Sequence, residues 1–364
     1  MLIRDIFTVL EEMAPLAYAE DFDNVGLIVG SPNQEVTGVL VCHDALEHVV
    51  EEAISKHCNL IVCFHPILFS GLKKITGKNY VERAVIKAIK NDIAIYAVHT
   101  ALDNHRQGVN KIFCDTLELI NTKILIPKDN HICKLVTYTI PENLEQLRNA
   151  LFNAGAGNIG NYENCSFIST GLGSYRGNLK SNPTIGKPGE LVEAKEIKVE
   201  VTFEKHLEEK IIKALFSNHV YEEVAYEVYN LKNRHQNIGL GMVGELEHAM
   251  DEKEFLLFVK EKMLAEGIRH SAFTGKPIKK VAVLGGSGSF AIKVAIASGA
   301  DAFLTADLKY HQFYEAEGKL LLADIGHFES ERYTKNYVGR YLESKGILCP
   351  VFISTVDTNP VKYL

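Results

Sequence analysis

The sequence lacks the features by which several protein classes are recognised. It has no Trp, and its seven cysteines include no CxxC pair, which argues against a cysteine-rich zinc site and a disulfide framework. No apolar run approaches the ~18 residues that a membrane span needs. The N-terminal segment carries Glu11 and Glu12 and is typical of an amphipathic helix, not of a signal peptide. We therefore expect a cytoplasmic protein with reduced thiols and no membrane partner.

Basic residues are also in short supply. The chain has 39 Lys and Arg against 46 Asp and Glu, so its net charge is −7 at pH 7. An extended nucleic-acid interface needs a basic surface, so we do not expect nucleic acid among the partners. The 364 residues, of which 46% are hydrophobic, are enough for about two or three domains with their own cores.

The first and last thirds of the chain alternate short apolar runs with helical patterns. The runs that predict strands lie at 36–42, 59–64, 93–98, 280–284, 302–305, 320–324 and 349–354. Continuous apolar strands separated by helices indicate parallel sheets covered on both faces. We therefore predict an α/β fold class. The core has parallel-rich sheets covered by helices and is split into two halves, 1–128 and 237–364.

The middle segment, 129–236, has a different order. Its pattern predicts strands and helices at 135–140 (strand), 144–154 (helix), 197–203 (strand), 207–216 (helix) and 224–229 (strand), with a Gly-rich polar stretch after the first helix. This order is the split βαβ pattern of a ferredoxin-like unit. Polar, turn-rich flanks mark its boundaries. The segment is therefore predicted to be an inserted α+β module.

Candidate site residues follow three of the predicted strands directly. His65 follows the strand at 59–64, His99 and Asp103 follow the next one, and His327 and Glu331 follow the strand at 320–324. Open α/β sheets bind ligands outside the carboxyl ends of their strands. We therefore expect these side chains to converge at one edge of the fold, although they are far apart in the sequence.

Imidazoles and carboxylates together suit a divalent metal ion. His327 and Glu331 are four residues apart, so they share one face of a helical turn, and Asp103 supplies a second carboxylate. Such a mixed set is the arrangement of two-metal hydrolases. The alternative is that the histidines are ordinary polar residues after strands, and that Glu329 and Glu331 are carboxylates that favour a helix N-terminus.

Asp307 and His311 form another pair four residues apart after a strand. They are candidates for residues that do not bind the metal themselves but orient its ligands through hydrogen bonds. The alternative is a helix cap and a surface histidine. An acidic turn with Asp21 and Asp23 is predicted to be an Asx turn, and its carboxylates are also candidates for lining a cleft.

A glycine-rich turn, 285–291, fits G-x-G-x-x-A at the start of a helix. Its amides are a candidate phosphate site. Asp301 is too close to serve as the ribose-binding acid of a dinucleotide site, so a tight strand-to-helix turn is the favoured interpretation.

Seven motifs, in this order, carry a resemblance that covers essentially the whole chain. They are EDFDNVGLIVG at 20–30, HPILF at 65–69, KKITG at 73–77, HTALDN at 99–104, TADLKYH at 305–311, GHFESE at 326–331 and STVDTNP at 354–360. Together they resemble the Nif-three-like family, whose members are often labelled GTP cyclohydrolase I type 2 homologues. The segment 129–236 resembles the inserted PII- or CutA-like module of the longer bacterial members.

The resemblance implies a dinuclear metal site in a toroidal homohexamer. Carried over by position, the metal ligands are His65, Asp103, His327 and Glu331, with His99 close by. One or two divalent ions are expected in each chain, with Zn, Fe, Mn, Ni and Mg as candidates. Family members usually carry two adjacent histidines where this chain has Phe64 before His65. Because Phe cannot bind a metal, the resemblance implies that His99 or water fills the gap, or that the second ion is weak or absent.

Two functions follow as hypotheses. The first is a metal-dependent hydrolase acting on a small polar substrate such as a nucleotide, with His99 as general acid or base. The second is a non-catalytic, metal-binding or regulatory ring in which the inserted module senses a ligand. The missing imidazole at Phe64 favours the second hypothesis, because a two-metal mechanism tolerates poor coordination badly.

Overall fold

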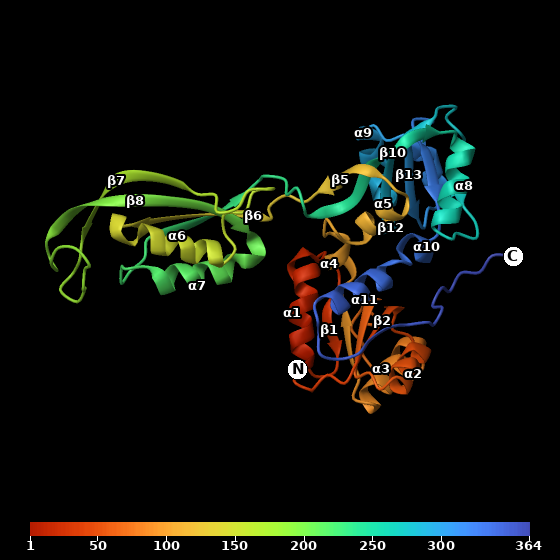
Figure 1. Cartoon of the computed structure of the whole chain (residues 1–364), viewed down its shortest axis with the longest axis horizontal. Coiled ribbons are helices and arrows are strands. Elements are labelled where there is room, and N and C mark those ends of the chain that lie inside the picture. Colours follow the sequence, from red (N-terminus) through yellow and green to blue (C-terminus); the bar gives the residue numbers. More distant parts are fainter. The chain divides into compact units, whose positions relative to one another are not determined.

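The computed structural model describes residues 1–364 and divides the chain into two compact units. Unit 1 consists of Met1–Pro127 and Asn237–Leu364, and unit 2 consists of Lys128–Gln236. Unit 2 is therefore inserted into unit 1, and Figure 1 shows it as the yellow and green segment. None of the helices combines the length and apolar character needed to cross a bilayer.

The first sheet of unit 1 has five strands in the order β1-β4-β3-β2-β15. These strands are β1 (Gly26–Val29), β2 (Val39–Asp44), β3 (Leu60–His65), β4 (Ala94–Ala97) and β15 (Val351–Ile353). All neighbours pair in parallel except β1, which is antiparallel to β4. The central strands are continuous apolar runs because helices bury both of their faces.

Side-chain alternation divides this sheet between two hydrophobic clusters. Val39 and Val41 of β2 point to one face, and Leu40 and Cys42 point to the other. The first face packs against a set that includes α1 (Ile3–Met13), α4 (His99–Asp103) and α11 (Thr334–Ser344). The second packs against α2 (Glu47–Ser55) and α3 (Tyr80–Lys90), which lie side by side in Figure 1. The short η1 (Leu16–Tyr18) follows α1.

The second sheet of unit 1 has six strands in the order β11-β14-β13-β12-β10-β5. These strands are β5 (Ile120–Pro127), β10 (Gly239–Met250), β11 (Arg269–His270), β12 (Ile278–Ser287), β13 (Ala302–Ala306) and β14 (Leu321–Asp324). The three strands β12, β13 and β14 are parallel. The helices of this half are α5 (Val109–Thr116), α8 (Glu252–Lys262), α9 (Ile292–Ala297), α10 (His327–Glu331), η4 (Ser289–Ala291) and η5 (Tyr310–Ala316).

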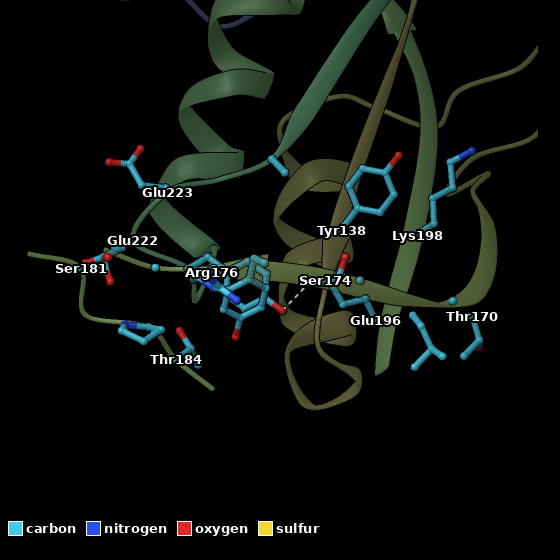
Figure 2. Close-up of a pocket in the computed structure, with 18 of the residues that line it drawn as sticks. Tyr138, Thr170, Ser174, Arg176, Ser181, Thr184, Glu196, Lys198, Glu222 and Glu223 are labelled. Atoms are coloured by element: carbon cyan, nitrogen blue, oxygen red, sulfur yellow. Dashed lines mark hydrogen bonds between the residues drawn. The ribbon is translucent and has the colours of Figure 1, made fainter. Parts of the chain in front are cut away.

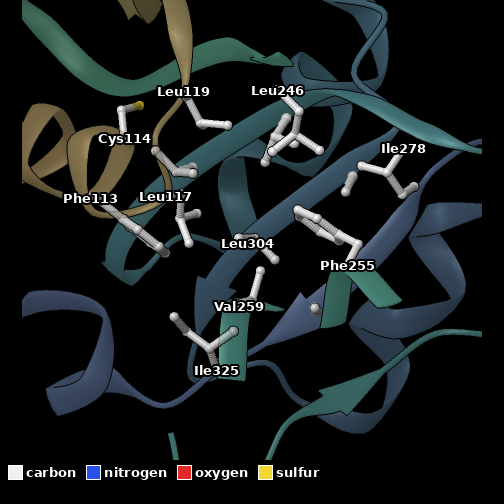
Figure 3. Packing of buried hydrophobic residues seen from close by; sticks show 14 of the residues in the cluster. Phe113, Cys114, Leu117, Leu119, Leu246, Phe255, Val259, Ile278, Leu304 and Ile325 are labelled. Carbon is white, nitrogen blue, oxygen red and sulfur yellow. The ribbon is translucent and has the colours of Figure 1, made fainter. Parts of the chain in front are cut away.

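A hydrophobic cluster joins α5 and α8 to this second sheet, as Figure 3 shows. Phe113 of α5, Phe255 of α8 and Leu304 of β13 are essentially fully buried in it. Helix α8 is fixed at its N-terminus because Asp251 accepts a hydrogen bond from the Lys253 amide at 2.9 Å. The cluster holds β13 and β14, whose carboxyl ends lead to Asp307 and to α10 of the site described below.

Unit 2 is an antiparallel four-stranded sheet in the order β7-β8-β6-β9, with two helices and its own core. Its elements are β6 (Ile132–Thr139), η2 (Pro141–Asn143), α6 (Leu144–Asn153), β7 (Phe167–Arg176), β8 (Leu191–Glu204), η3 (Lys205–Leu207), α7 (Glu208–Asn218) and β9 (Tyr226–Leu231). The chain order β-α-β-β-α-β is that of a ferredoxin-like unit. The predicted fold class, a split α/β core with a ferredoxin-like insert, is confirmed.

The sequence pattern missed one long hairpin of unit 2. Strand β7 lies in the stretch that reads as Gly-rich and polar, and β8 begins at Leu191, earlier than the strand predicted at 197–203. The outer half of β8 pairs with residues 171–176 of β7, and most of these side chains are exposed. An exposed strand pair has no buried face, so no apolar alternation marks it in the sequence.

Candidate metal centre

The candidate site lies in unit 1, where polar residues end two neighbouring parallel strands and begin a helix. Strand β2 ends at His43 and Asp44, and β3 ends at His65. The register places Asp44 directly opposite His65. Helix α10 begins just after β14 and carries both His327 and Glu331. The convergence expected from strand ends therefore occurs for these residues.

One carboxylate oxygen is the focus of the site. The Oε2 atom of Glu331 lies 3.3 Å from Nε2 of His65, 3.3 Å from Nε2 of His327 and 3.5 Å from Nε2 of His43. Glu331 is only 4% exposed, and its Oε2 has no hydrogen-bond partner. These separations exceed the usual N–H···O range of about 2.7–3.2 Å. Ligand atoms around a tetrahedral ion with bonds of about 2.0–2.2 Å lie about 3.3–3.6 Å apart, so a cation fits these spacings.

The charges around Glu331 favour a cation as well. Burial alone would raise the pKa of Glu331, but the His327, His43 and His65 imidazoles outweigh it and hold that pKa well below its usual range. Burial also acts to lower the pKa of His65, yet the carboxylates of Asp44 and Glu331 raise it to about 9. For His327, Glu331 and Asp307 overcome burial in the same way and raise the pKa to about 11. When no metal ion is bound, the positive charge beside Glu331 therefore comes from protonated His65 and His327.

Two further carboxylates, those of Asp44 and Asp307, hydrogen-bond to Nδ1 of His65 and His327. Asp44 Oδ1 lies 2.8 Å from Nδ1 of His65, and Asp307 Oδ2 lies 2.7 Å from Nδ1 of His327. A carboxylate that accepts a hydrogen bond from Nδ1–H fixes the tautomer and leaves Nε2 free to bind a metal. Both Nε2 atoms face Glu331, as such an arrangement requires.

Asp103 contributes a second buried carboxylate from α4. Its Oδ1 is buried without a hydrogen-bond partner. Burial, and then repulsion by Glu331, raise the pKa of Asp103 well above its usual range. Two carboxylates that repel each other inside a protein are stabilised by a cation near both, so Asp103 also fits a metal centre.

His99 lies beside these groups, with its ring centre 5.2 Å from that of His65. Its Nδ1 lies 2.9 Å from Asp23 Oδ1, and the Thr100 amide donates to Asp23 Oδ2 at 3.0 Å. Burial would raise the pKa of Asp23, but the bonds with His99 and Thr100 lower it to about 2. Asp23 also accepts from the Asn24 amide at 2.8 Å. An Asx turn would need the amide two residues on, so this bond does not form the predicted Asx turn, and the Asp23 carboxylate instead holds His99 and Thr100.

The second predicted pair, Asp307 and His311, is separated by the fold. Asp307 contacts His327, as described above. His311 is exposed on η5, where its ring packs against Tyr310 and Tyr314. None of its described contacts involves the residues around Glu331, so the structure brings only one member of the pair to the site.

The glycine-rich turn packs against Glu331 and its neighbour Ser330 on α10. The amide of Gly285 donates to Asn110 Oδ1 at 3.0 Å, and that of Gly286 donates to Ser330 Oγ at 2.9 Å. Gly286 has φ +68°, and a Cβ there would lie 2.5 Å from Glu331 Oε1. Because these two amides are already bonded within the protein, the turn serves close packing of α10 and does not offer them to a phosphate.

His43 and Asp44 are the site residues that sequence reasoning missed. They follow the apolar run at 36–42 just as His65 follows the run at 59–64. The rule on strand ends therefore applied to them as well. Two groups in the structure could hold a metal ion, with ligand atoms within 4.8 Å of one another: His43, Asp44 and His65, and His65, His327 and Glu331.

Comparisons with known proteins agree with the motifs. A family model described as Duf34/NIF3 (NGG1p interacting factor 3) matches residues 1–360. The chain belongs to the NIF3 family. The resemblance inferred from the seven motifs is thus confirmed.

Relatives of this NIF3-family protein match over nearly their full length. A Bacillus subtilis protein named "GTP cyclohydrolase 1 type 2 homolog" is 40% identical over 99% of this chain and 98% of its own. A solved Bacillus cereus protein related to NIF3 is 35% identical, with a TM-score of 0.88, over 100% of this chain and 99% of its own. A solved Staphylococcus aureus protein is 28% identical, with a TM-score of 0.79 and the same coverage.

A cavity of about 380 Å³ opens at the candidate metal centre of this NIF3-family chain. Its lining includes His43, His65, His327, Arg269, Asn359 and Tyr363. Arg269 is the only Lys or Arg in the lining and is ion-paired with Asp324, and three more carboxylates line the cavity, those of Asp44, Asp307 and Glu329. The volume suits a small molecule, for which protein pockets commonly measure about 300–1,000 Å³.

Unit 2 of the NIF3-family protein has a cavity of its own, of about 570 Å³. Figure 2 shows side chains of both charge signs around it, among them Arg176, Lys198, Glu196 and Glu222. Tyr221 donates to Glu196 Oε1 at 2.8 Å and fixes that carboxylate. The inserted unit therefore carries a polar cavity whose lining residues all belong to unit 2.

Proposed function

We propose that this protein binds a divalent cation through His65, Asp103, His327 and Glu331 and acts as a metal-dependent hydrolase. The observation that carries the proposal is the buried, unpartnered Oε2 of Glu331, which two imidazole Nε2 atoms approach to 3.3 Å from different parts of the chain. The unpartnered oxygen of Asp103 supports it as well. Zn, Fe, Mn, Ni and Mg are candidate ions.

Each group of site residues would have its own role in hydrolysis. A divalent cation, when bound, supplies a Lewis acid that polarises a C=N, amide or phosphoryl group and makes water a better nucleophile near neutral pH. Asp44 and Asp307 hold His65 and His327 in the orientation that presents Nε2. His99 transfers the proton: Asp23 holds its Nδ1, which leaves Nε2 to accept or donate.

The cavity indicates a small polar substrate. Asn359 and Tyr363 supply groups that donate hydrogen bonds. Arg269 is ion-paired with Asp324, and Asp44, Asp307 and Glu329 also line the cavity, so the bound cation would supply the positive charge that attracts an anionic substrate such as a nucleotide. The relatives named "GTP cyclohydrolase 1 type 2 homolog" point to the same class of substrate.

The test is hydrolysis of a panel of nucleotides by metal-depleted protein before and after reloading with each candidate ion. We expect turnover only after reloading, and a loss of at least about 100-fold in His65→Ala and Glu331→Ala. His48→Ala, which removes an exposed imidazole on α2, is the matched control and should keep full activity. Turnover that survives both site substitutions in metal-depleted protein would rule out the proposal.

The cavity of unit 2 favours a second candidate function. According to this second proposal, the protein is a cytoplasmic homohexameric ring that binds metal, senses a small ligand through unit 2 and catalyses no reaction. The mixed charges of Arg176, Lys198 and Glu196 suit a small ligand that carries both signs or several polar groups. About one ion per chain without hydrolysis across the panel supports this function, and two ions with turnover support the hydrolase. Light scattering tests the ring.

A further inference from the structure

His43 stands out among the histidines of the chain. It is only 3% exposed, and both of its ring nitrogens are buried without a hydrogen-bond partner. A neutral imidazole has one donor and one acceptor, and burying either without a partner costs free energy. No other histidine has both nitrogens in this state. Such a side chain needs a partner that the protein atoms do not supply.

A partly buried histidine with a structural role, His219, looks different in this protein. Nε2 of His219 lies 3.0 Å from the carbonyl oxygen of Tyr138, and its Nδ1 accepts from the Tyr221 amide at 3.1 Å. Both ring nitrogens are therefore satisfied by the backbone. His43 makes neither kind of bond.

Strand geometry explains where the imidazole of His43 points. The register pairs Cys42 with Cys63 and Asp44 with His65, so His43 lies beside Phe64 on the neighbouring strand. The rings of Phe64 and Phe328 lie with their centres 5.5 and 5.0 Å from that of His43. These apolar neighbours offer no hydrogen bond and fix the ring on its sides. The free nitrogen Nε2 lies 3.5 Å from Glu331 Oε2.

We propose that His43 is a further ligand of the metal centre and binds a divalent cation through Nε2, beside the carboxylate of Glu331. This inference rests on the proposed metal binding and names one more residue that performs it. His43 and His65 also share one of the two groups whose ligand atoms lie within 4.8 Å of one another, and His65 is common to both groups. Phe64 has no ligand atom, so the adjacent strand β2 provides the imidazole at this position.

A third imidazole changes which ion the centre prefers. The inference places three imidazole nitrogens around Glu331 Oε2, since Nε2 of His43, His65 and His327 lie 3.5, 3.3 and 3.3 Å from it. Imidazole suits Zn²⁺, Fe²⁺, Ni²⁺ and Cu²⁺, whereas Mg²⁺ prefers oxygen ligands and water. The inferred centre is therefore selective for a transition metal or zinc and discriminates against Mg²⁺.

The test compares Zn²⁺ affinity, by competition with a chromophoric chelator, in the parent, His43→Leu and His48→Leu. In His43→Leu, an apolar side chain of similar size fills the space between Phe64 and Phe328. His48, which is exposed on α2, is the control position. We expect His43→Leu to lower the Zn²⁺ affinity at least tenfold and to reduce the preference for Zn²⁺ over Mg²⁺. His48→Leu should change neither. Equal Zn²⁺ affinity in the parent and in His43→Leu would overturn the inference.

Two further measurements separate metal binding from folding. The melting temperature of metal-free His43→Leu should equal or exceed that of the parent, because the substitution removes an unpartnered buried polar group. The shift of melting temperature on adding Zn²⁺ should shrink. A metal-free variant that is already unfolded would instead make His43 a packing residue and overturn the inference.

Diffraction from the Zn²⁺-loaded parent tests the same point without a substitution. We expect an anomalous peak within about 2.0–2.3 Å of His43 Nε2. A peak bonded to His65, His327 or Glu331 but not to His43 refutes the inference and leaves the proposed metal binding intact. A parent that binds no Zn²⁺ at all refutes both.

Discussion

Removing the charge of the carboxylates behind the two histidines should weaken metal binding in a graded way. In Asp44→Asn and Asp307→Asn, the amide oxygen can still accept the hydrogen bond from Nδ1 of His65 or His327, but the negative charge is lost. The charge makes the imidazole a stronger metal ligand. These substitutions therefore test the electrostatic part of the arrangement and leave its geometry in place.

The structure also sets the relative size of the two effects. Loss of such an outer partner typically costs about 10–100-fold in metal affinity, or about 1.4–2.7 kcal/mol. The side chains of Asp44 and His65 are 25% and 23% exposed, whereas those of Asp307 and His327 are 51% and 38% exposed. Water screens the second pair more strongly. We expect about a 100-fold loss for Asp44→Asn and about a tenfold loss for Asp307→Asn.

The assay is competition for Zn²⁺ with a chromophoric chelator at fixed pH and salt. Glu51→Gln, which removes an exposed carboxylate paired with Lys87 on the surface, is the control and should leave the affinity unchanged. Parent-like affinity in both Asp44→Asn and Asp307→Asn would refute the interpretation that these carboxylates support metal ligands. A reversed order would show that burial does not set the size of the effect.

Three further predictions follow from the same structure. His65 and His327 have raised pKa values of about 9 and about 11 without metal, and that of Asp103 is also raised, so Zn²⁺ must displace at least two protons. Its affinity should therefore rise by at least about 100-fold per pH unit from pH 6 to 8; chelator competition at three pH values checks this, and a pH-independent affinity contradicts it. Leu304→Ala in the cluster of Figure 3 should lower the free energy of unfolding of unit 1 by about 2–5 kcal/mol, measured by urea titration, and an effect below about 1 kcal/mol would mean that the cluster is loosely packed. Gly286→Ala should weaken Zn²⁺ binding because its Cβ would lie 2.5 Å from Glu331 Oε1, whereas Gly318→Ala, where a Cβ has open space, should not; equal Zn²⁺ affinities would contradict this reasoning.

The sequence predicted the parts of the fold that are buried on both faces. Strands β2, β3, β4 and β13 are continuous apolar runs, and such runs need no further context to be recognised. The β7–β8 hairpin was not recognised, because its exposed side chains follow no apolar alternation. Its formation depends on backbone pairing, which leaves little trace in composition.

The candidate site was predictable to the extent that it depends on strand ends and helix spacing. His65, Asp103, His327 and Glu331 could be selected because each follows an apolar strand or shares a helical face. The contact of Asp23 with His99 could not, because Asp23 precedes β1 and the rule on strand ends does not select it. The role of the turn at Gly286 depends on how closely α10 packs against it, which spacing alone does not reveal.

Crystals of the metal-loaded protein, measured across the absorption edge of the bound metal, test the central claim most directly. The account predicts an anomalous peak within about 2.0–2.3 Å of Glu331 Oε2 and of an imidazole Nε2 of His65 or His327. An absence of any peak at saturating metal, or a peak bonded only to residues elsewhere in the chain, would contradict it.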